Sequence, residues 1–215
     1  LLRNGNYIWR NNVEVVDVRS DGSKAVVIAR NGEIFEGDVA IVCPGADHTS
    51  LFKDQLDTAP IRRVRLQMMS TAPLDEVLTT SIADGDSMRY YPGYEVPALE
   101  NLPPQHPIAS SNHMQLLMVQ RADGSLTIGD THEYAEPFEF KLDEDPYTYL
   151  HDVASNLLGK KLPPIAHRWD GVYSQVTDGG ICDRRTIAQI SVTGPGGRGN
   201  TLAPAIAEET IKGLS

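Results

Sequence analysis

The sequence predicts a mixed α/β (α+β) fold, in which an antiparallel-sheet domain is inserted into a partial layer of strands that closes with a C-terminal helix. Three observations predict it. Short strand-like runs alternate with hairpin turns near the start, one strongly amphipathic helix stands in the second half, and a glycine-rich loop leads directly into the last helix. The 215 residues, of which 40% are hydrophobic, are enough for one to two globular domains.

The first fifty residues are expected to form β structure. The dipeptides Asp21-Gly22 and Asn31-Gly32 are typical hairpin turns, and they separate runs rich in valine and isoleucine. The next run, 38–43, is continuously apolar and ends at Pro44-Gly45, as a strand buried on both faces and stopping beneath a ligand does. The preceding strands are expected at 13–18, 24–29 and 34–35.

The middle of the chain is expected to hold an antiparallel sheet and one helix. Apolar alternation predicts strands at 64–70, 115–120 and 126–128. The helix is expected over 146–158, because Asp145 can cap it, Pro146 suits its first turn, and Gly159 can end it.

The last part returns to the first layer. Strands are expected at 166–173 and 187–192, and a final helix is expected from about 200 to 212. The resulting domains are a first layer over 1–58, a sheet domain with one helix over 59–162, and a return to the first layer over 163–215.

Composition excludes several classes of protein. A formal net charge of -10 opposes binding to nucleic acid, whose phosphates such a surface would repel. The two cysteines, Cys43 and Cys182, have no metal-binding spacing and are too few for a disulfide framework, so reduced thiols in a cytoplasmic protein and no metal site are expected. No apolar run reaches the length of a membrane span.

The glycine-rich loop TGPGGRGNT at 193–201 is the strongest candidate for ligand binding. Its glycines allow close backbone approach and positive φ, and the helix that follows directs unpaired N–H groups and partial positive charge at its ligand. An electron-rich group is expected there, either phosphate or flavin. The alternative is a flexible surface loop capped by Asn200.

Further motifs accompany this loop in a fixed order. They are the strand end at Cys43-Pro44-Gly45, the segment Trp169-Asp170-Gly171, and the turn Thr177-Asp178-Gly179-Gly180. In this order the chain resembles the C-terminal portion of the FAD-dependent oxidoreductases that include D-amino-acid oxidase, glycine oxidase and sarcosine oxidase. It looks most like bacterial members associated with aminophosphonate catabolism.

The resemblance implies a partial FAD-binding layer and a substrate domain. It also implies that FAD is bound non-covalently, because Gly171 occupies what looks like the position where sarcosine oxidases attach flavin to cysteine. No G-x-G-x-x-G motif precedes the first strands, so the chain as given is expected to bind FAD weakly and to be inactive alone. The residues expected to contact FAD are Val15, Pro44, Gly45, Gly171, Gly196, Gly197, Arg198, Gly199, Asn200 and Thr201.

The implied reaction is oxidation of the C–N bond of an amine or amino acid, with hydride passing to flavin N5 and oxygen or a quinone as the final acceptor. The residues expected on the substrate side are Tyr173, Arg89, Tyr91 and His132, with Tyr90, Tyr94 and His113 as further candidates. Homo-oligomerisation is left open. The alternative is a non-catalytic subunit or binding module of a multi-subunit dehydrogenase.

Overall fold

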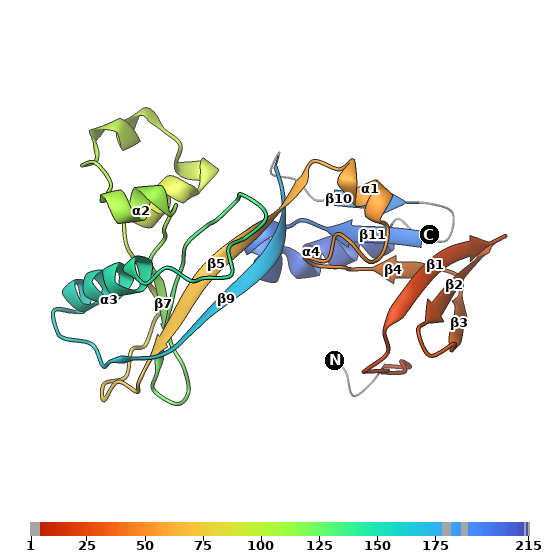
Figure 1. Ribbon diagram of the computed structural model, residues 1–215, viewed down its shortest axis with the longest axis horizontal. Coiled ribbons are helices and arrows are strands. Elements are labelled where there is room, and N and C mark those ends of the chain that lie inside the picture. The colour runs from red at the N-terminus through yellow and green to blue at the C-terminus, as the bar shows by residue number, and fades with distance from the viewer. Residues whose placement is uncertain (1–4, 178–181, 186–188, 213, 215) are drawn as a thin grey trace. The chain divides into compact units, whose positions relative to one another are not determined.

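The computed structural model describes residues 5–177, 182–185, 189–212 and 214 (Figure 1). Their backbone contacts divide the chain into two compact units. Unit 1 comprises residues 1–62 and 174–215, and unit 2 comprises residues 63–173. The division at 58 and 163 that the sequence suggested stays a prediction about the domains of the protein.

Unit 1 begins with a three-stranded antiparallel meander. Its strands are β1 (Val15–Asp21), β2 (Lys24–Ala29) and β3 (Ile34–Gly37), paired in the order β1-β2-β3. Gly22 and Gly32 have φ of 63° and 86° at the two turns, a conformation that glycine adopts without steric cost. The two predicted hairpins are therefore confirmed.

A second sheet of unit 1 pairs its strands in the order β10-β11-β4. These strands are β10 (Cys182–Arg185), β11 (Gln189–Thr193) and β4 (Ala40–Val42). β11 and β4 run parallel, with Ile190 opposite Ile41. Short helix α1 (Lys53–Asp57) follows β4 in the chain, while η4 (Gly196–Arg198) and α4 (Gly199–Lys212) follow β11. The last helix thus begins one residue before the predicted position.

The expectation that the strand before Pro44 is buried on both faces is wrong for the described residues. β4 lies at the edge of its sheet, and the side chain of Ile41 is 41% exposed. The apolar run reported a strand correctly, but burial depends on which elements pack against its two faces, and a run of hydrophobic residues does not specify those elements.

Unit 2 is built on the five-stranded sheet β6-β7-β8-β5-β9. The strands β6 (Ile82–Ala83), β7 (Leu117–Gln120) and β8 (Leu126–Gly129) pair antiparallel, and β5 pairs antiparallel with β8. β5 (Ile61–Thr71) and β9 (Ile165–Val176) each contribute residues to both units. The connection from β6 to β7 consists of η1 (Asp86–Tyr90), η2 (Pro92–Tyr94), η3 (Pro97–Asn101) and α2 (Pro107–Ser111).

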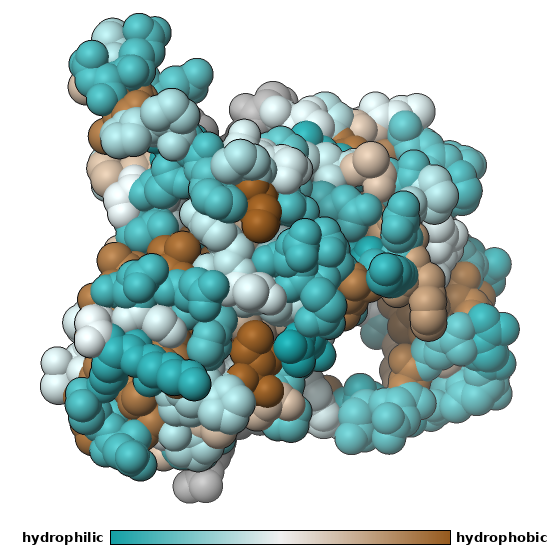
Figure 2. Space-filling model, turned by 60° about the vertical axis from the view of Figure 1, so that its left-hand side comes forward, coloured by the Kyte–Doolittle hydropathy of each residue, from teal (hydrophilic) through white to brown (hydrophobic). Residues whose placement is uncertain are grey.

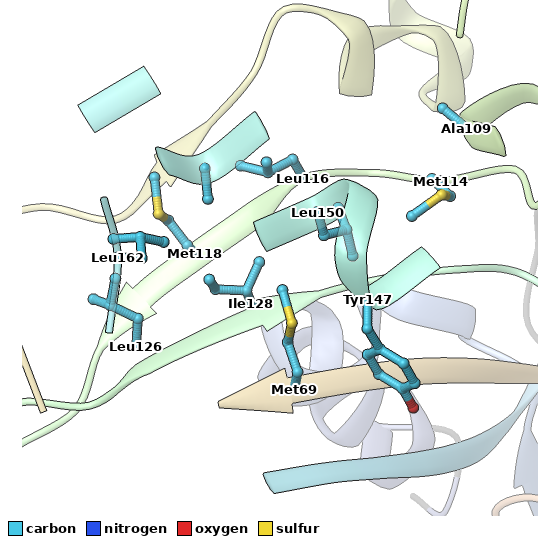
Figure 3. Packing of buried hydrophobic residues seen from close by; sticks show 11 residues of the cluster. Met69, Ala109, Met114, Leu116, Met118, Leu126, Ile128, Tyr147, Leu150 and Leu162 are labelled. Atoms are coloured by element: carbon cyan, nitrogen blue, oxygen red, sulfur yellow. The ribbon is translucent and has the colours of Figure 1, made fainter. Parts of the chain in front are cut away.

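Helix α3 (Asp145–Leu158) covers one face of this sheet and completes the core of unit 2. Figure 3 shows Leu150 of α3, Ile128 of β8 and Met69 of β5 gathered in the space between the helix and the sheet. Gly159 ends the helix in the left-handed conformation, with φ of 65°, as predicted. Glu144 occupies the N-cap, so the predicted cap Asp145 is instead the first helical residue.

The surface agrees with the acidic composition. Figure 2 shows a face on which hydrophilic residues predominate and hydrophobic residues occur in small groups. Within the described ranges, no helix has both the length and the apolar character needed to cross a membrane.

Candidate functional site

Two of the segments expected to contact the cofactor, Pro44-Gly45 and the loop that leads into α4, meet at the carboxyl ends of β4 and β11. Because β4 and β11 are parallel, the turn after β4 and the loop after β11 both leave the sheet at the carboxyl ends of the strands. The hydroxyl of Thr193 donates to the carbonyl oxygen of Gly45 at 2.9 Å and joins the two segments. Carboxyl ends of parallel strands are where open α/β sheets bind their ligands.

The N-terminus of α4 comes shortly after the carboxyl end of β11. The chain passes from Thr193 through Gly194, Pro195 and η4 into the helix, and Asn200 and Thr201 lie in its first turn. That turn contains no acidic residue, so the partial positive charge of the 14-residue helix is not offset by a carboxylate of its own first turn. This geometry suits an electron-rich group such as the edge of a flavin ring.

Gly194 in the loop and Gly45 in the turn after β4 serve two different purposes. A Cβ on Gly194 would lie 2.5 Å from Cγ2 of Val176, and φ is 85°, so this glycine is needed for packing inside the protein. Gly45 has φ of 61°, but a Cβ there would meet no atom within 4 Å. The space beside Gly45 is therefore open to a ligand, and this fits the close approach expected of a dinucleotide.

Val15 lies in a different part of unit 1. It lines a pocket of about 420 Å³ whose walls come from β1, β2, β3, β4 and the segment after β4. The other lining residues are mostly apolar and include Val18, Phe35 and Leu51. A planar, weakly polar group is the kind of ligand such walls accommodate.

Gly171 lies on β9 in unit 2, and a Cβ there would also meet no atom within 4 Å. In the turn Thr177-Asp178-Gly179-Gly180, only Thr177 belongs to the described residues. Its backbone N–H donates to the carbonyl of Pro60 at 2.8 Å. The rest of this motif lies outside the described residues.

The substrate-side candidates of unit 2 form an aromatic cluster, which we call the Tyr90 cluster. The hydroxyls of Tyr90 and Tyr173 are 3.3 Å apart, and the ring of Tyr90 stacks on His132 with centroids 4.3 Å apart. Tyr91 meets the Tyr90 ring edge-on at 5.6 Å. Tyr134 stacks on the other side of the group, with its ring centroid 6.3 Å from that of His132.

Three of the four predicted substrate-side residues, Tyr173, His132 and Tyr91, thus belong to this cluster, and Tyr90 joins them. Tyr90 was one tyrosine among several in the run YYPGY, and nothing in the sequence distinguished it from Tyr91. The structure separates them, because only Tyr90 hydrogen-bonds to Tyr173.

Tyr173 remains a phenol at physiological pH. Its burial, followed by its hydrogen bond to Tyr90 and the nearby charge of Asp130, raises its pKa well above the ordinary value. A neutral phenol both donates and accepts a hydrogen bond, so Tyr173 can orient a polar substrate group without adding charge to the site.

Arg89 is held in a different environment. Its guanidinium donates to the carboxylate of Asp86 at 2.5 Å and to the carbonyl of Pro103 at 2.7 Å. It lines a pocket of about 600 Å³ formed by residues 85–106 and Tyr149, and these do not include His132 or Tyr173. Two of its N–H groups are thus already used within the protein.

Asp130 is the residue that sequence reasoning missed. It follows β8 directly, and its Oδ1 lies 4.0 Å from Nδ1 of His132. Burial raises the pKa of its carboxyl to about 7. The sequence pattern that could have indicated it was a carboxylate at a strand end, two positions before a histidine. The burial that raises its pKa cannot be read from the sequence.

His48, a further candidate from the sequence because it follows the Gly45 turn, pairs with Ser174 in unit 1. Nε2 of His48 lies 2.9 Å from Oγ of the buried Ser174, while the carboxylate of the neighbouring Asp47 accepts from Thr49 and Ser50. Hydrogen bonds from Ser50 and Thr49 lower the pKa of Asp47 to about 2. Over the described parts of the chain, no three His, Cys, Asp or Glu side chains are grouped to hold a metal ion.

Parallel strands ending at a glycine-containing turn and a helix N-terminus are typical of α/β proteins that bind nucleotide cofactors. A model of the FAD dependent oxidoreductase family (DAO) matches residues 2–212. The chain belongs to this family of FAD-dependent oxidoreductases. No curated protein matches it by sequence.

Solved structures confirm the fold. Glycine oxidase from Geobacillus kaustophilus superposes with a TM-score of 0.61 at 16% identity, over 90% of this chain and 45% of that one. L-proline dehydrogenase from P. horikoshii gives 0.64 at 15% identity, over 90% and 47%. Iminodiacetate oxidase (IdaA) from Chelativorans sp. BNC1 gives 0.55 at 17% identity, over 90% and 46%. The chain spans less than half the length of each of these proteins.

Proposed function

We propose that this chain belongs to an enzyme that oxidises the C–N bond of an amine or amino acid, using non-covalently bound FAD. The observation that carries the proposal is the family match over residues 2–212, together with a glycine-rich loop and helix N-terminus of the kind that suits a flavin edge. FAD, when bound, supplies the acceptor for hydride at N5. Glycine oxidase and iminodiacetate oxidase among the similar structures favour nitrogen-bearing substrates. The match to a family of oxidoreductases does not favour the alternative of a non-catalytic subunit.

In this proposal unit 1 holds the cofactor. Gly196 to Thr201 would lie beside the pyrimidine side of the flavin. Their backbone N–H groups at the start of α4 would stabilise the negative charge that develops there. Pro44 and Gly45 would lie along the dinucleotide, where the open space beside Gly45 permits close approach. Val15 would contact the adenine side from its apolar pocket.

Unit 2 supplies the substrate-side groups. Tyr173 and Tyr90 contribute a pair of neighbouring hydroxyl groups. The ring of His132 stacks on Tyr90, and Tyr91 packs edge-on against Tyr90. Such a wall of aromatic rings with a few polar tips orients a small polar substrate and excludes water. Arg89 could pair an acid group of the substrate only by exchanging its contact with Asp86 or Pro103.

The test is reduction of the flavin by substrate under anaerobic conditions in the intact protein. Amines or amino acids should bleach the visible flavin absorbance, and the corresponding hydroxy acids should not. Tyr173→Phe should lower kcat/KM by about tenfold or more, because loss of one oriented hydroxyl costs at least about 1.4 kcal/mol in the transition state.

Tyr7→Phe is the matched control, since Tyr7 is 49% exposed and belongs to neither group of candidates. If only the hydroxy acids bleached the flavin, the proposed amine oxidation would be wrong and the enzyme would carry out a different oxidation. Equal turnover of Tyr173→Phe and Tyr7→Phe would remove Tyr173 from the reaction.

A further inference from the structure

The carboxyl group of Asp130 is buried with one oxygen unused. Its backbone is fixed on both sides by Gln115, whose carbonyl accepts from the Asp130 N–H at 2.6 Å and whose N–H donates to the Asp130 carbonyl at 3.0 Å. Its side chain is 17% exposed, and Oδ1 is fully buried without a hydrogen-bond partner. A buried polar atom without a hydrogen-bond partner destabilises the folded state, because it has lost its hydrogen bonds to water and gained none in the protein.

His132 lies close to this carboxyl and can carry positive charge. Its Nδ1 is 2.9 Å from the carbonyl oxygen of His113 and 4.0 Å from Oδ1 of Asp130. The same ring nitrogen therefore has two acceptors within a short movement of the ring. When Asp130 is protonated, the carbonyl of His113 is the better acceptor, and when Asp130 is ionised, the carboxylate is the stronger one.

A movement of the His132 ring would be transmitted to the hydroxyl groups of the cluster. Tyr90 stacks on His132 with an interplanar angle of 28°, and the Tyr90 hydroxyl meets that of Tyr173 at 3.3 Å. Tyr134 and His113 border the same group, with ring centroids 5.2 Å apart. Close-packed rings cannot shift singly, so a change at His132 must displace Tyr90 or alter its stacking.

We propose that Asp130 is a positioning residue of the Tyr90 cluster: gain or loss of a proton on its unpartnered carboxyl oxygen selects which acceptor His132 uses and so sets the Tyr90–Tyr173 hydroxyl pair. The proton is exchanged with solvent, and no covalent bond between heavy atoms changes. The meaning of this switch for catalysis rests on the proposed function, but the switch itself does not.

The electrostatics of the site support this role. Burial holds the pKa of Asp130 at about 7, where a small change in pH changes its charge. The titratable groups that interact with it are His132, whose Nδ1 lies 4.0 Å from Oδ1, and Tyr173 of β9, whose pKa the charge of Asp130 helps to raise. Tyr90 of η1 and Tyr134 contact His132, and His113 contacts Tyr134. Within the described parts of the chain, neither lysine nor arginine pairs with this carboxyl to keep it ionised.

The experiment follows the aspartate side-chain carbons by NMR as pH is raised, on intact protein carrying labelled aspartate. The Asp130 signal should titrate near pH 7, well above the range of exposed aspartates, and the ring signals of His132 and Tyr90 should move with the same midpoint. In Asp130→Asn the movement of the Tyr90 signal at this midpoint should vanish.

Asp123→Asn is the matched control, because Asp123 lies in the turn between β7 and β8 and accepts only from Ser125. His132→Gln provides a second arm if Asp130→Asn folds poorly: loss of the imidazole ring, whose Nδ1 lies 4.0 Å from Oδ1 of Asp130, should move the Asp130 midpoint by at least half a unit. Titration of Asp130 together with the exposed aspartates, or a Tyr90 signal that ignores it, would overturn the proposal.

A separate arm links the switch to turnover. The pH profile of kcat/KM should lose one limb near pH 7 in Asp130→Asn and keep it in Asp123→Asn. If no amine reduces the flavin while the NMR titration behaves as expected, the proposed function fails and the switch stands. An unchanged pH profile in Asp130→Asn, with active enzyme, would contradict the positioning role even if Asp130 titrates as expected.

Discussion

Asp130 shows how one buried side chain can give the whole protein a pH-dependent stability. Burial favours the neutral carboxyl in the folded state, while the same group in the unfolded chain ionises at its ordinary value of 3.8. Between about pH 4 and pH 7 the folded state therefore binds more protons than the unfolded state. The contribution of Asp130 to stability therefore falls as pH rises through that window.

The first prediction concerns this loss. Asp130→Asn should be more stable than the wild type at pH 8 by up to about 4 kcal/mol, because a difference of about three pKa units is removed. Near pH 4 most of the advantage should disappear, since Asp130 in the folded state is then neutral like asparagine and the unfolded group is only about half ionised. Urea unfolding at the two pH values measures it.

Asp123→Asn serves as the control for this experiment. Hydrogen bonds from Ser125 lower the pKa of the exposed Asp123, so its substitution should give no gain in stability at pH 8. A difference between Asp130→Asn and wild type that stays constant from pH 4 to pH 8 would show that Asp130 titrates alike in the folded and unfolded states.

Helix α3 carries its stabilising contacts on one face only. Leu150 is 2% exposed and packs against Ile128 and Met69, whereas Leu157 on the same helix is 48% exposed. The helical spacing of the sequence places both leucines on one apolar face, so the period indicates the correct face but not how far its burial extends. The extent of burial depends on how far the sheet extends beneath the helix.

The second prediction follows from this difference. Leu150→Ala should lower the free energy of unfolding by about 2–5 kcal/mol, the cost of a cavity in a packed core. Leu157→Ala should lower it by less than about 1 kcal/mol, since little of its surface is buried. Denaturant unfolding of the two variants makes the comparison at equal helix propensity. Equal losses would mean that α3 is not anchored through Leu150.

At the level of the whole molecule, the proposed function assigns the cofactor to unit 1. FAD that binds only the folded state stabilises it by an amount set by its concentration relative to Kd, about 2.7 kcal/mol at a hundredfold excess. Gly197 is exposed in the segment before α4, so in the proposed arrangement a side chain there would meet the cofactor rather than the protein core.

The third prediction tests this arrangement on the intact protein after its FAD has been removed. Addition of FAD should raise the unfolding temperature of the wild type, and Gly197→Val should abolish most of that rise while leaving the cofactor-free protein almost unchanged. Gly85→Val is the control, because a Cβ at Gly85 meets no atom within 4 Å and the residue lies in unit 2. An undiminished rise in Gly197→Val would remove the loop from the cofactor site.

The aminophosphonate association, the electron acceptor and the oligomeric state stay predictions, because none of them is fixed by a fold shared at 14–17% identity with proteins of several activities. The whole protein's substrate is decided by side chains that differ between members of one fold. In the proposed function, the Tyr90 cluster and its neighbour Asp130 are the side chains of this chain that make that decision.

The sequence by itself determined the hairpins at Gly22 and Gly32, helix α3 and its end at Gly159, and the loop that leads into α4. Each of these depends on backbone preferences and periodicity within a few residues, and such short-range information is written directly in the chain.

Only the tertiary structure decided that Tyr90 rather than Tyr91 meets Tyr173, that the carboxyl of Asp130 is buried, and that β4 leaves Ile41 exposed. The Tyr90–Tyr173 contact joins positions 83 residues apart in the chain. Burial and pKa depend on all the atoms that surround a group, and those atoms are brought together only when distant strands and helices pack.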